Sequence, residues 1–148
     1  MNIDIVWFKR DFRLEDHAPI NAVATSNNDF LGIFIIEPSR FKQKDNDSIH
    51  IDWELKCAIK LQNRIRLLGG EMFILHGEVI DIFKEISSKY NISNIYSHEE
   101  TGTEWSYNRD IEVASWFESQ KINWKEYPTN AVIRRLKDRD NWYKSRIE

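Results

Sequence analysis

The stretch Ile3-Asp4-Ile5-Val6-Trp7-Phe8 decides the fold of this chain. It is a nearly continuous apolar run, and such a run is typical of a strand buried on both faces of a parallel sheet. A second run of the same kind covers Phe30–Ile36. Two buried strands separated by a helical segment predict an α/β domain built around a central parallel sheet.

Amphipathic segments separate the predicted strands. Asp16 is the expected N-cap, and Pro19 the expected first-turn residue, of a helix that ends near Ser26. A longer helix is predicted from apolar residues that recur every three or four positions, and Gly69-Gly70 is expected to end it. The apolar stripe of this helix consists of Ile51, Leu55, Ala58, Leu61, Ile65 and Leu68.

The rest of the chain repeats this alternation. Strands are predicted at residues 72–75, 92–96 and 122–127, and helices at 79–90 and from 103 or 104 to about 119. The five strands and four helices predict a Rossmann-like three-layer sandwich. We expect a five-stranded parallel sheet of order 3-2-1-4-5, with right-handed crossovers and helices on both faces.

The composition fits one globular domain without a metal or disulfide framework. Of the 148 residues, 41% are apolar and 30% charged, which is enough for a core and too balanced for disorder. The single cysteine excludes an intrachain disulfide, and the four histidines lack the spacing of a metal site. The apolar runs are shorter than the ~20 residues of a membrane span, so we expect a soluble, cytoplasmic protein that does not contact membranes.

Charge is distributed unevenly along the chain. The whole chain carries −3, whereas residues 131–148 hold six basic and three acidic side chains. This change predicts a domain at residues 1–128 and a distinct segment at 129–148. We expect the apolar side chains of that segment to pack back on the sheet or on a neighbouring chain, as in a homo-oligomer, because exposed apolar patches usually mark an interface. A solvated tail is the alternative.

The predicted strand order places two charged loops, 9–16 and 97–103, at the point where ligands bind in open α/β sheets. Arg10 is the best candidate for an anionic group, since a guanidinium binds carboxylate or phosphate bidentately, and Trp53 or Trp105 is the best candidate for stacking on a ring. A ligand cleft and a structural ion-pair network are both consistent with these charges. The candidate binding residues are Phe8, Lys9, Arg10, Asp11, Arg13, Glu37, Trp53, Glu99, Glu100 and Trp105. We predict no catalytic residue and no phosphate-binding glycine loop.

Three segments in register carry a family resemblance. Residues 6–14, followed by Asp16-His17, resemble the amino-terminal signature VWFRRDLRLxDN of the DNA photolyase and cryptochrome family. Residues 98–110 and 127–142 are similar to two later segments of that family. Lys9 stands where the signature usually has Arg, His17 where it has Asn, and Ala131 where the connector commonly has Gly.

The resemblance implies an amino-terminal α/β antenna domain that is followed, in the family, by a helical domain. The antenna domain commonly holds a light-harvesting chromophore, which is a folate, a deazaflavin, FMN or a lumazine. The helical domain binds FAD, engages damaged DNA and carries out DNA repair as a carbon-carbon lyase, or supports blue-light sensing. This chain resembles the first domain and the start of the connector, residues 129–148. We therefore expect it to have no FAD site, to contact damaged DNA only through the missing FAD-binding domain, and to be inactive alone.

Two other functions are consistent with the sequence. One is a stand-alone nucleotide-binding module resembling universal stress proteins, although those usually carry a glycine-rich phosphate loop that this chain lacks. The other is an interaction domain whose cleft binds no small molecule. Absorbance of the bound chromophore at 350–450 nm would indicate the antenna domain, and stabilisation by ATP would indicate the stress-protein-like module.

Overall fold

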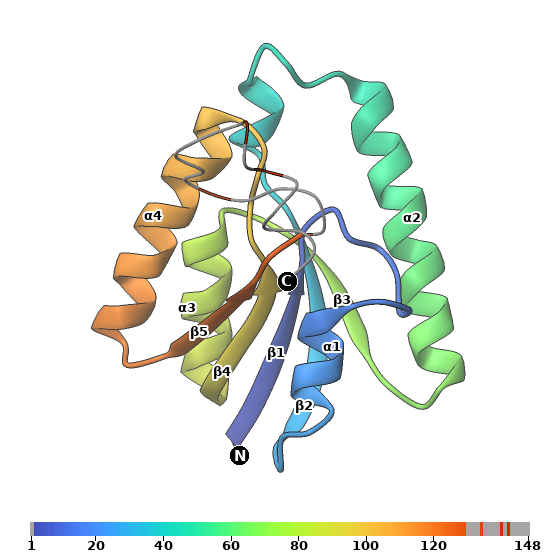
Figure 1. Cartoon of the computed structure of the whole chain (residues 1–148), viewed down its shortest axis with the longest axis vertical. Coiled ribbons are helices and arrows are strands. Elements are labelled where there is room, and N and C mark those ends of the chain that lie inside the picture. Colours follow the sequence, from blue (N-terminus) through green and yellow to red (C-terminus); the bar gives the residue numbers. More distant parts are fainter. Residues whose placement is uncertain (1, 130–133, 135–139, 141, 143–148) are drawn as a thin grey trace.

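The strands of the central sheet lie in the order β3-β2-β1-β4-β5, and every pairing is parallel (Figure 1). The computed structural model describes residues 2–129, 134, 140 and 142. The strands are β1 (Asn2–Phe8), β2 (Asp29–Ile36), β3 (Met72–His76), β4 (Asn91–His98) and β5 (Asn123–Tyr127). The predicted fold class and strand order are confirmed. Strand order reverses between β1 and β4.

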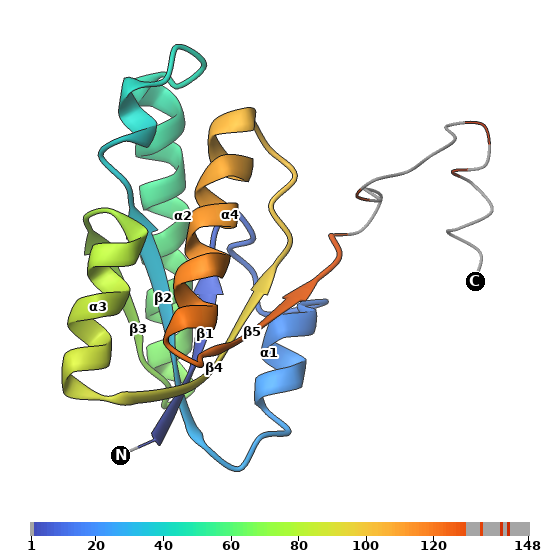
Figure 2. The same ribbon diagram turned by 90° about the vertical axis from the view of Figure 1, so that its left-hand side faces the viewer.

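Helices cover both faces of the sheet. They are α1 (Ala18–Val23), α2 (Ser48–Leu67), α3 (Val79–Lys89) and α4 (Glu104–Ser119), and a short 3₁₀ helix, η1 (Arg40–Lys42), follows β2. The buried side chains of α3 and α4 pack in one core cluster, and those of α1 and α2 pack in another. Figure 2 shows α3 and α4 in front of the sheet and α2 behind it.

Strand β1 supplies side chains to both core clusters, which is why its sequence is a continuous apolar run. Ile3, Ile5 and Trp7 face α3 and α4, whereas Val6 and Phe8 face α1 and α2. This division follows from the alternation of side chains along a strand. The ring of Trp7 lies 5.6 Å from that of Phe83 and 5.7 Å from that of Trp124, so β1 is anchored on α3 and β5 by aromatic contacts.

The charged residue within β1 is satisfied by hydrogen bonds. Asp4 is 0% exposed, and its Oδ1 accepts from the Asn94 backbone N–H at 3.1 Å, from Asn94 Nδ2 at 2.9 Å and from Asn28 Nδ2 at 3.1 Å. The register of β1 against β4 shifts between Ile3 and Asp4. The buried carboxyl is tolerated because its acceptor atoms find donors on two neighbouring segments.

The ends of the helices confirm one sequence prediction and correct another. Gly69 has φ 83°, and the N–H groups of Gly69 and Gly70 bond to the carbonyls of Arg66 and Ile65 at 3.0 Å, which is the glycine-terminated end predicted for this pair. The prediction that Asp16 caps α1 is wrong. Asp16 has φ 49°, whereas His17 has the extended N-cap conformation and its ring accepts from the Ile20 N–H, and the helix ends at Val23 rather than near Ser26.

The segment 129–148 lies largely outside the described residues, which here include only Thr129, Arg134, Asp140 and Trp142. Packing of this segment on the sheet or on a second chain therefore stays a prediction. Strand β5 ends at Tyr127, next to the predicted domain boundary. Within the described part of the chain, no helix combines the length and the apolar character that crossing a membrane requires.

Candidate ligand-binding cleft

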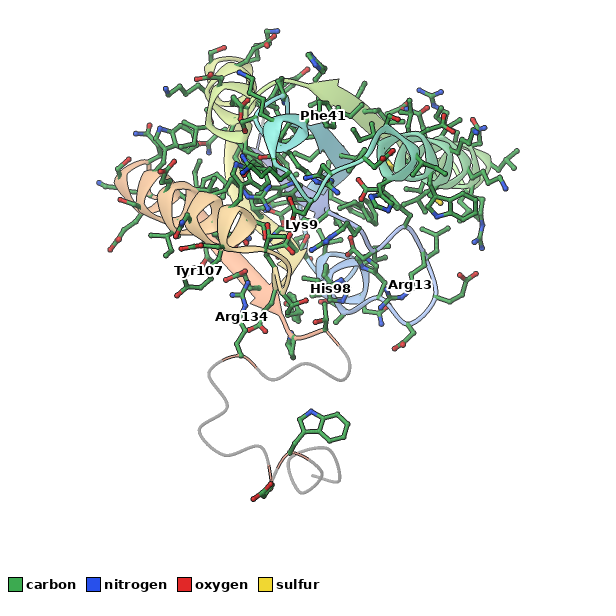
Figure 3. The ribbon with its side chains drawn as sticks, turned by 90° about the horizontal axis from the view of Figure 1, so that it is seen from above. Lys9, Arg13, Phe41, His98, Tyr107 and Arg134 are labelled. Atoms are coloured by element: carbon green, nitrogen blue, oxygen red, sulfur yellow. The ribbon has the colours of Figure 1, made fainter. Side chains whose placement is uncertain are left out.

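A cleft of about 370 Å³ opens at the carboxyl ends of the strands, where strand order reverses. Trp7 and Phe8 at the end of β1 line it, together with Glu37 directly after β2. Trp53 on α2 and Trp105 on α4 add indole side chains. Figure 3 views the molecule from this end and shows Lys9 near the centre of the sheet. Ligand sites of open α/β sheets lie in this position.

The cleft brings together most of the residues predicted from the sequence. Lys9 is buried, Arg10 is half-exposed and Trp53 is exposed at 69%. These residues come from β1, the loop after it, the end of β2, α2, the loop after β4 and α4. The predicted residues that line the cleft are Phe8, Lys9, Arg10, Glu37, Trp53, Glu100 and Trp105.

Three predicted residues lie outside the cleft because each has a closer partner. Asp11 contacts the side chains of two histidines, His17 and His98. The guanidinium of Arg13 donates to the backbone oxygen of Asp16 at 2.9 and 3.1 Å, which closes its own loop. Glu99 extends the pairing of β4 with β5 through its N–H, which donates to the Tyr127 oxygen at 2.8 Å, and its side chain lines a separate depression with Arg134.

Beside the cleft lies a buried ion network centred on Asp110. One carboxylate oxygen of Asp110 accepts from Lys9 Nζ at 2.9 Å, and the other accepts from Arg109 Nε at 2.7 Å. Burial lowers the pKa of Lys9, although Asp110 acts in the opposite direction. The side chains of Lys9 and Asp110 are each only 8% exposed. The network fixes the end of β1 against α4 across 101 residues of sequence.

Arg109 is the functional candidate that sequence reasoning missed. Its Cζ lies 5.1 Å from the centre of the Trp7 ring and 5.5 Å from that of Trp105, so the guanidinium contacts both indoles. Its Nη1 also donates to Glu37. The available signal was the spacing of Trp105 and Arg109, four residues apart and therefore on one face of a helix. The Arg109 guanidinium thus contacts both Trp105 and Glu37 and holds these two side chains of the cleft in place.

Glu37 is the most perturbed acid of the cleft. It is 5% exposed, and burial raises its pKa to about 7 although Arg109 acts to lower it. One oxygen bonds to Arg109, but the other, Oε2, is buried and makes no hydrogen bond within the described part of the structure. Buried polar atoms without a hydrogen-bond partner are rare in folded proteins, and Glu37 Oε2 is one of them.

The loop after β4 is organised around the carboxylate of Glu100. Its Oε1 accepts from Arg10, from the Thr101 N–H at 3.1 Å and from the Gly102 N–H at 2.9 Å. Burial alone would raise its pKa, but Arg10, Lys9 and Arg109 outweigh burial and hold the pKa below its usual value. A Cβ at position 102 would overlap the end of the Arg10 side chain and Glu100 Oε1, so glycine leaves room for this ion pair.

Another ion pair defines the wall formed by α2. The guanidinium of Arg40, in η1, donates to both carboxylate oxygens of Glu54 at 2.7 Å. This bidentate contact holds η1 against α2. Glu54 and Glu37 both line the cleft, but both carboxylate oxygens of Glu54 accept hydrogen bonds, whereas only one oxygen of Glu37 does so within the described residues.

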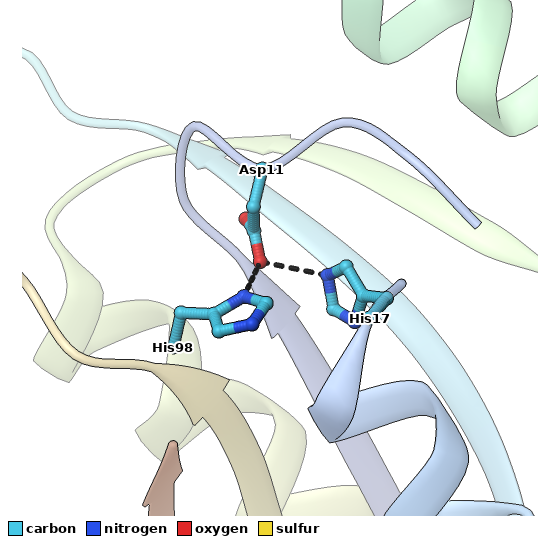
Figure 4. A group of neighbouring side chains, drawn as sticks. All are labelled: Asp11, His17 and His98. Carbon is cyan, nitrogen blue, oxygen red and sulfur yellow. Dashed lines mark hydrogen bonds and ion pairs between the residues drawn. The ribbon is translucent and has the colours of Figure 1, made fainter. Parts of the chain in front are cut away.

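Asp11 lies between two buried histidines (Figure 4). Its Oδ2 is 2.7 Å from His17 Nε2 and 2.6 Å from His98 Nδ1, and its Oδ1 accepts from the Lys9 N–H at 2.8 Å. Burial alone would raise the pKa of Asp11, but hydrogen bonds with His17 and His98 outweigh it and hold the pKa well below its usual range. The cluster ties the loop after β1 to α1 and β4.

These three side chains also have the identity of a metal-ligand set, and their ligand atoms lie within 4.8 Å of one another. His17 Nδ1, however, accepts from the Ile20 N–H at 3.3 Å, which assigns the ring proton to Nε2 and directs it at Asp11. A metal bound through Nε2 would require a proton on Nδ1, facing that donor. The donor set therefore favours a hydrogen-bonded cluster over a metal centre.

Replacing His17 by Ala should lower the free energy of unfolding by about 2–3 kcal/mol. The change removes the N-cap of α1 and one donor to the buried Asp11 carboxylate. Urea unfolding measures the loss. His17→Asn should recover part of it, because asparagine is a strong N-cap residue. A loss below about 0.5 kcal/mol for His17→Ala would show that the cluster contributes little.

A larger groove lies on the other side of the sheet, between α1 and α2. Its volume is about 720 Å³, and its lining includes Leu14, Ile20, Phe30 and Leu68. Residues at the start of β2 and before β3 also line it, so it extends to the amino ends of these strands. The lining of this groove is mostly apolar, whereas the cleft combines indoles with several charges. The cleft is therefore the better candidate for a ligand site.

The fold and the cleft define a doubly wound α/β domain that has a cleft at its topological switch point. The chain belongs to the DNA photolyase family, whose model matches residues 4–139. It is 26% identical over 100 residues to a deoxyribodipyrimidine photo-lyase of Alkalihalophilus pseudofirmus, a match that covers 60% of this chain and 20% of that protein. It is 22% identical over 116 residues to a cryptochrome DASH of Gloeobacter violaceus, covering 74% and 23% of the two chains.

Solved structures share the same fold. An archaeal photolyase from Sulfolobus tokodaii superposes with a TM-score of 0.77 at 22% identity, covering 98% of this chain and 34% of that one. That photolyase contains two FAD molecules, which imply a novel light-harvesting cofactor. A class III photolyase from Agrobacterium tumefaciens gives a TM-score of 0.78 at 15% identity, covering 93% and 28%. The chain thus spans about a fifth to a third of the length of these relatives.

Proposed function

We propose that this chain is the antenna-chromophore domain of a photolyase-like flavoprotein. The observation that carries the proposal is the cleft at the carboxyl ends of the strands, which is lined by three indoles and a set of cations in a domain of the photolyase family. The chromophore classes considered are a folate, a deazaflavin, FMN and a lumazine. All combine a flat heteroaromatic ring with a polar or acidic substituent.

The residues of the cleft fit the two parts of such a molecule. Trp105 on α4 and the exposed Trp53 on α2 offer faces on which a ring stacks. Arg10, whose side chain is 47% exposed and whose Nη2 donates to Glu100, would bind a carboxylate or phosphate near the opening through its other N–H groups. The protein's role is to orient the ring, exclude water and set the local field, whereas the bound chromophore supplies absorption of near-ultraviolet or blue light.

In a full-length protein the excitation would pass to FAD held by a helical domain. The archaeal relative described with two FAD molecules motivates this arrangement, since its description links them to a novel light-harvesting cofactor. Binding of damaged DNA and repair chemistry would then belong to that second domain. This chain alone should not reverse pyrimidine dimers, and its net charge of −3 disfavours tight binding to duplex DNA.

Thermal melting of the purified chain with a chromophore panel tests the proposal. The panel contains methenyltetrahydrofolate, a hydroxylated deazariboflavin, FMN, a ribityllumazine and ATP. A ligand at about 100 times its Kd stabilises by about 2.7 kcal/mol, so we expect one chromophore to raise Tm by roughly 5–10 °C.

Two variants control the panel. Trp105→Ala should reduce the increase in Tm, because it removes a stacking face of the cleft. Glu99→Gln, outside the cleft, should not. An increase with ATP but with no chromophore would favour a nucleotide-binding module, and no increase with any ligand would favour an interaction domain.

A further inference from the structure

Arg134 lies beyond the predicted domain boundary at residue 128, but its partners belong to the α/β domain. Its Nε and Nη2 both donate to the backbone oxygen of Glu100, at 3.0 and 2.6 Å. Its Nη1 lies 3.3 Å from each carboxylate oxygen of Glu126 in β5. Figure 3 shows the Arg134 side chain extending from the segment after β5 toward the domain. One guanidinium, with its five N–H donors, thus contacts the loop after β4 and strand β5 together.

The surface that receives Arg134 is acidic. Glu99 Oε2 lies 3.8 Å from Arg134 Nε, and Asp110 Oδ2 lies 3.9 Å from Arg134 Nη2. Within the described part of the chain, the ion pairs of Glu99 and Glu126 are both with Arg134. The Arg134 side chain is only 27% exposed, so salt and solvent screen these contacts less than they would on an open surface. Without this guanidinium, three carboxylates would lie close together with less compensating charge.

Glu100 connects this contact to the cleft, because its main chain and its side chain have different arginine partners. Its backbone oxygen accepts from Arg134, whereas its carboxylate accepts from Arg10 and from the N–H groups of Thr101 and Gly102. Both Glu100 and Arg10 line the cleft. A shift of the Glu100 main chain would carry its carboxylate along, and with it the ion pair at the cleft.

The middle of the loop after β4 depends on Arg134 for its fixation. The start of the loop is tied to β5 by the hydrogen bond from the Glu99 N–H to the Tyr127 oxygen at 2.8 Å. Its end is fixed by Thr103, the N-cap of α4. Among the described residues, the hydrogen bonds that the main chain of residues 100–102 makes with groups outside the loop are those with Arg134.

We propose that Arg134 is a latch that couples the segment after β5 to the wall of the cleft. It fixes the loop that carries Glu100, and it thereby positions the ion pair between Glu100 and Arg10 from outside the cleft. Arg134 is a positioning residue, since it acts on the cleft through Glu100. By linkage, displacement of Arg134 loosens this wall, and an occupant that tightens the wall strengthens the Arg134 contact. This coupling holds for any occupant and does not rest on the antenna function.

Amide hydrogen exchange of the full chain, followed by NMR, tests the latch. The N–H groups of Thr101 and Gly102 report on the loop, because both donate to the Glu100 carboxylate rather than to a group of Arg134. Arg134→Gln removes charge-assisted hydrogen bonds to the Glu100 backbone, so we expect both amides to exchange roughly tenfold faster than in wild type. Near-ultraviolet circular dichroism of each variant establishes that it is folded.

Three further variants define the contact. Glu126→Gln weakens one partner of Arg134, and we expect the loop amides to exchange about threefold faster. Glu104→Gln is the matched control, since Glu104 lines the same depression as Arg134 but is not its ion-pair partner, and the exchange should stay at the wild-type rate. Arg134→Lys keeps the charge without the planar fork, so its exchange rates should lie between those of wild type and Arg134→Gln.

Exchange of the Arg10 guanidinium protons with water is the readout at the cleft. The contact with Glu100 slows this exchange, and it should become faster in Arg134→Gln although Arg10 is a partner of the Glu100 side chain and not of Arg134. Loop amides that exchange within twofold of the wild-type rate in Arg134→Gln would overturn the latch. Faster loop amides with unchanged Arg10 protons would overturn the coupling to the cleft, and an equal effect of Glu104→Gln would show that the contact is not specific.

Discussion

Replacing Asp110 by Ala should lower the free energy of unfolding by about 3–5 kcal/mol. Removing one partner of a buried ion pair leaves an uncompensated charge in a site of low dielectric. Here the change removes the partner of Lys9, whose Nζ lies 2.9 Å from Asp110, and one partner of Arg109, whose Nε lies 2.7 Å from it. Arg109 keeps its contacts with Glu37 and Glu100. Urea unfolding followed by circular dichroism measures the loss.

A double variant separates charge from packing at this site. Lys9→Met with Asp110→Leu replaces both charges by apolar groups of similar size, and such replacements are often neutral or stabilising. We expect the double variant to recover most of the loss, although Arg109 still loses one partner. If Asp110→Ala lowers the free energy of unfolding by less than about 1 kcal/mol, the ion network between β1 and α4 contributes little to stability.

The difference in free energy of unfolding between Glu37→Gln and wild type should change by about 3 kcal/mol in favour of the variant as the pH rises from about 4 to about 8. Burial raises the pKa of Glu37 from 4.5 to about 7 in the folded protein. Between these values the folded protein keeps a proton that the unfolded chain has released, so wild-type stability falls as pH rises. Each pKa unit corresponds to about 1.36 kcal/mol, and glutamine does not titrate.

The neighbours of Glu37 determine how large this effect is. Arg109 and Arg40 act to lower its pKa, whereas Glu78 and Asp110 act to raise it. The other titrating groups are common to both proteins, so they cancel in the difference between variant and wild type. Urea unfolding at about pH 4, 6 and 8 gives that difference. A value constant within about 0.5 kcal/mol would show that Glu37 titrates normally in the folded protein.

The fold was predictable because its signals are local. The continuous apolar run of β1 reflects burial on both faces, and the Gly69-Gly70 pair encodes the end of α2 through a backbone conformation that favours glycine. The N-cap of α1 was mispredicted for an equally local reason. Asp16 is the commoner cap residue, but its left-handed backbone leaves the cap position to His17.

The site was predictable in position but not in its pairings. Placing the loops after β1 and β4 together followed from strand order, which also brought Lys9 and Glu100 to the cleft. The contact of Lys9 with Asp110 spans 101 residues and depends on the register of α4, which no sequence pattern sets. The position of Asp11 outside the cleft was not predictable either, because its hydrogen bonds with His17 and His98 form only in the folded chain.

Crystallography of the chain with the panel chromophore that raises Tm most tests the central claim directly. We expect electron density for the ring in the cleft at the carboxyl ends of β1 and β2, with a ring face on Trp105 or Trp53. Density in the groove between α1 and α2, or only on the outer surface, would contradict it.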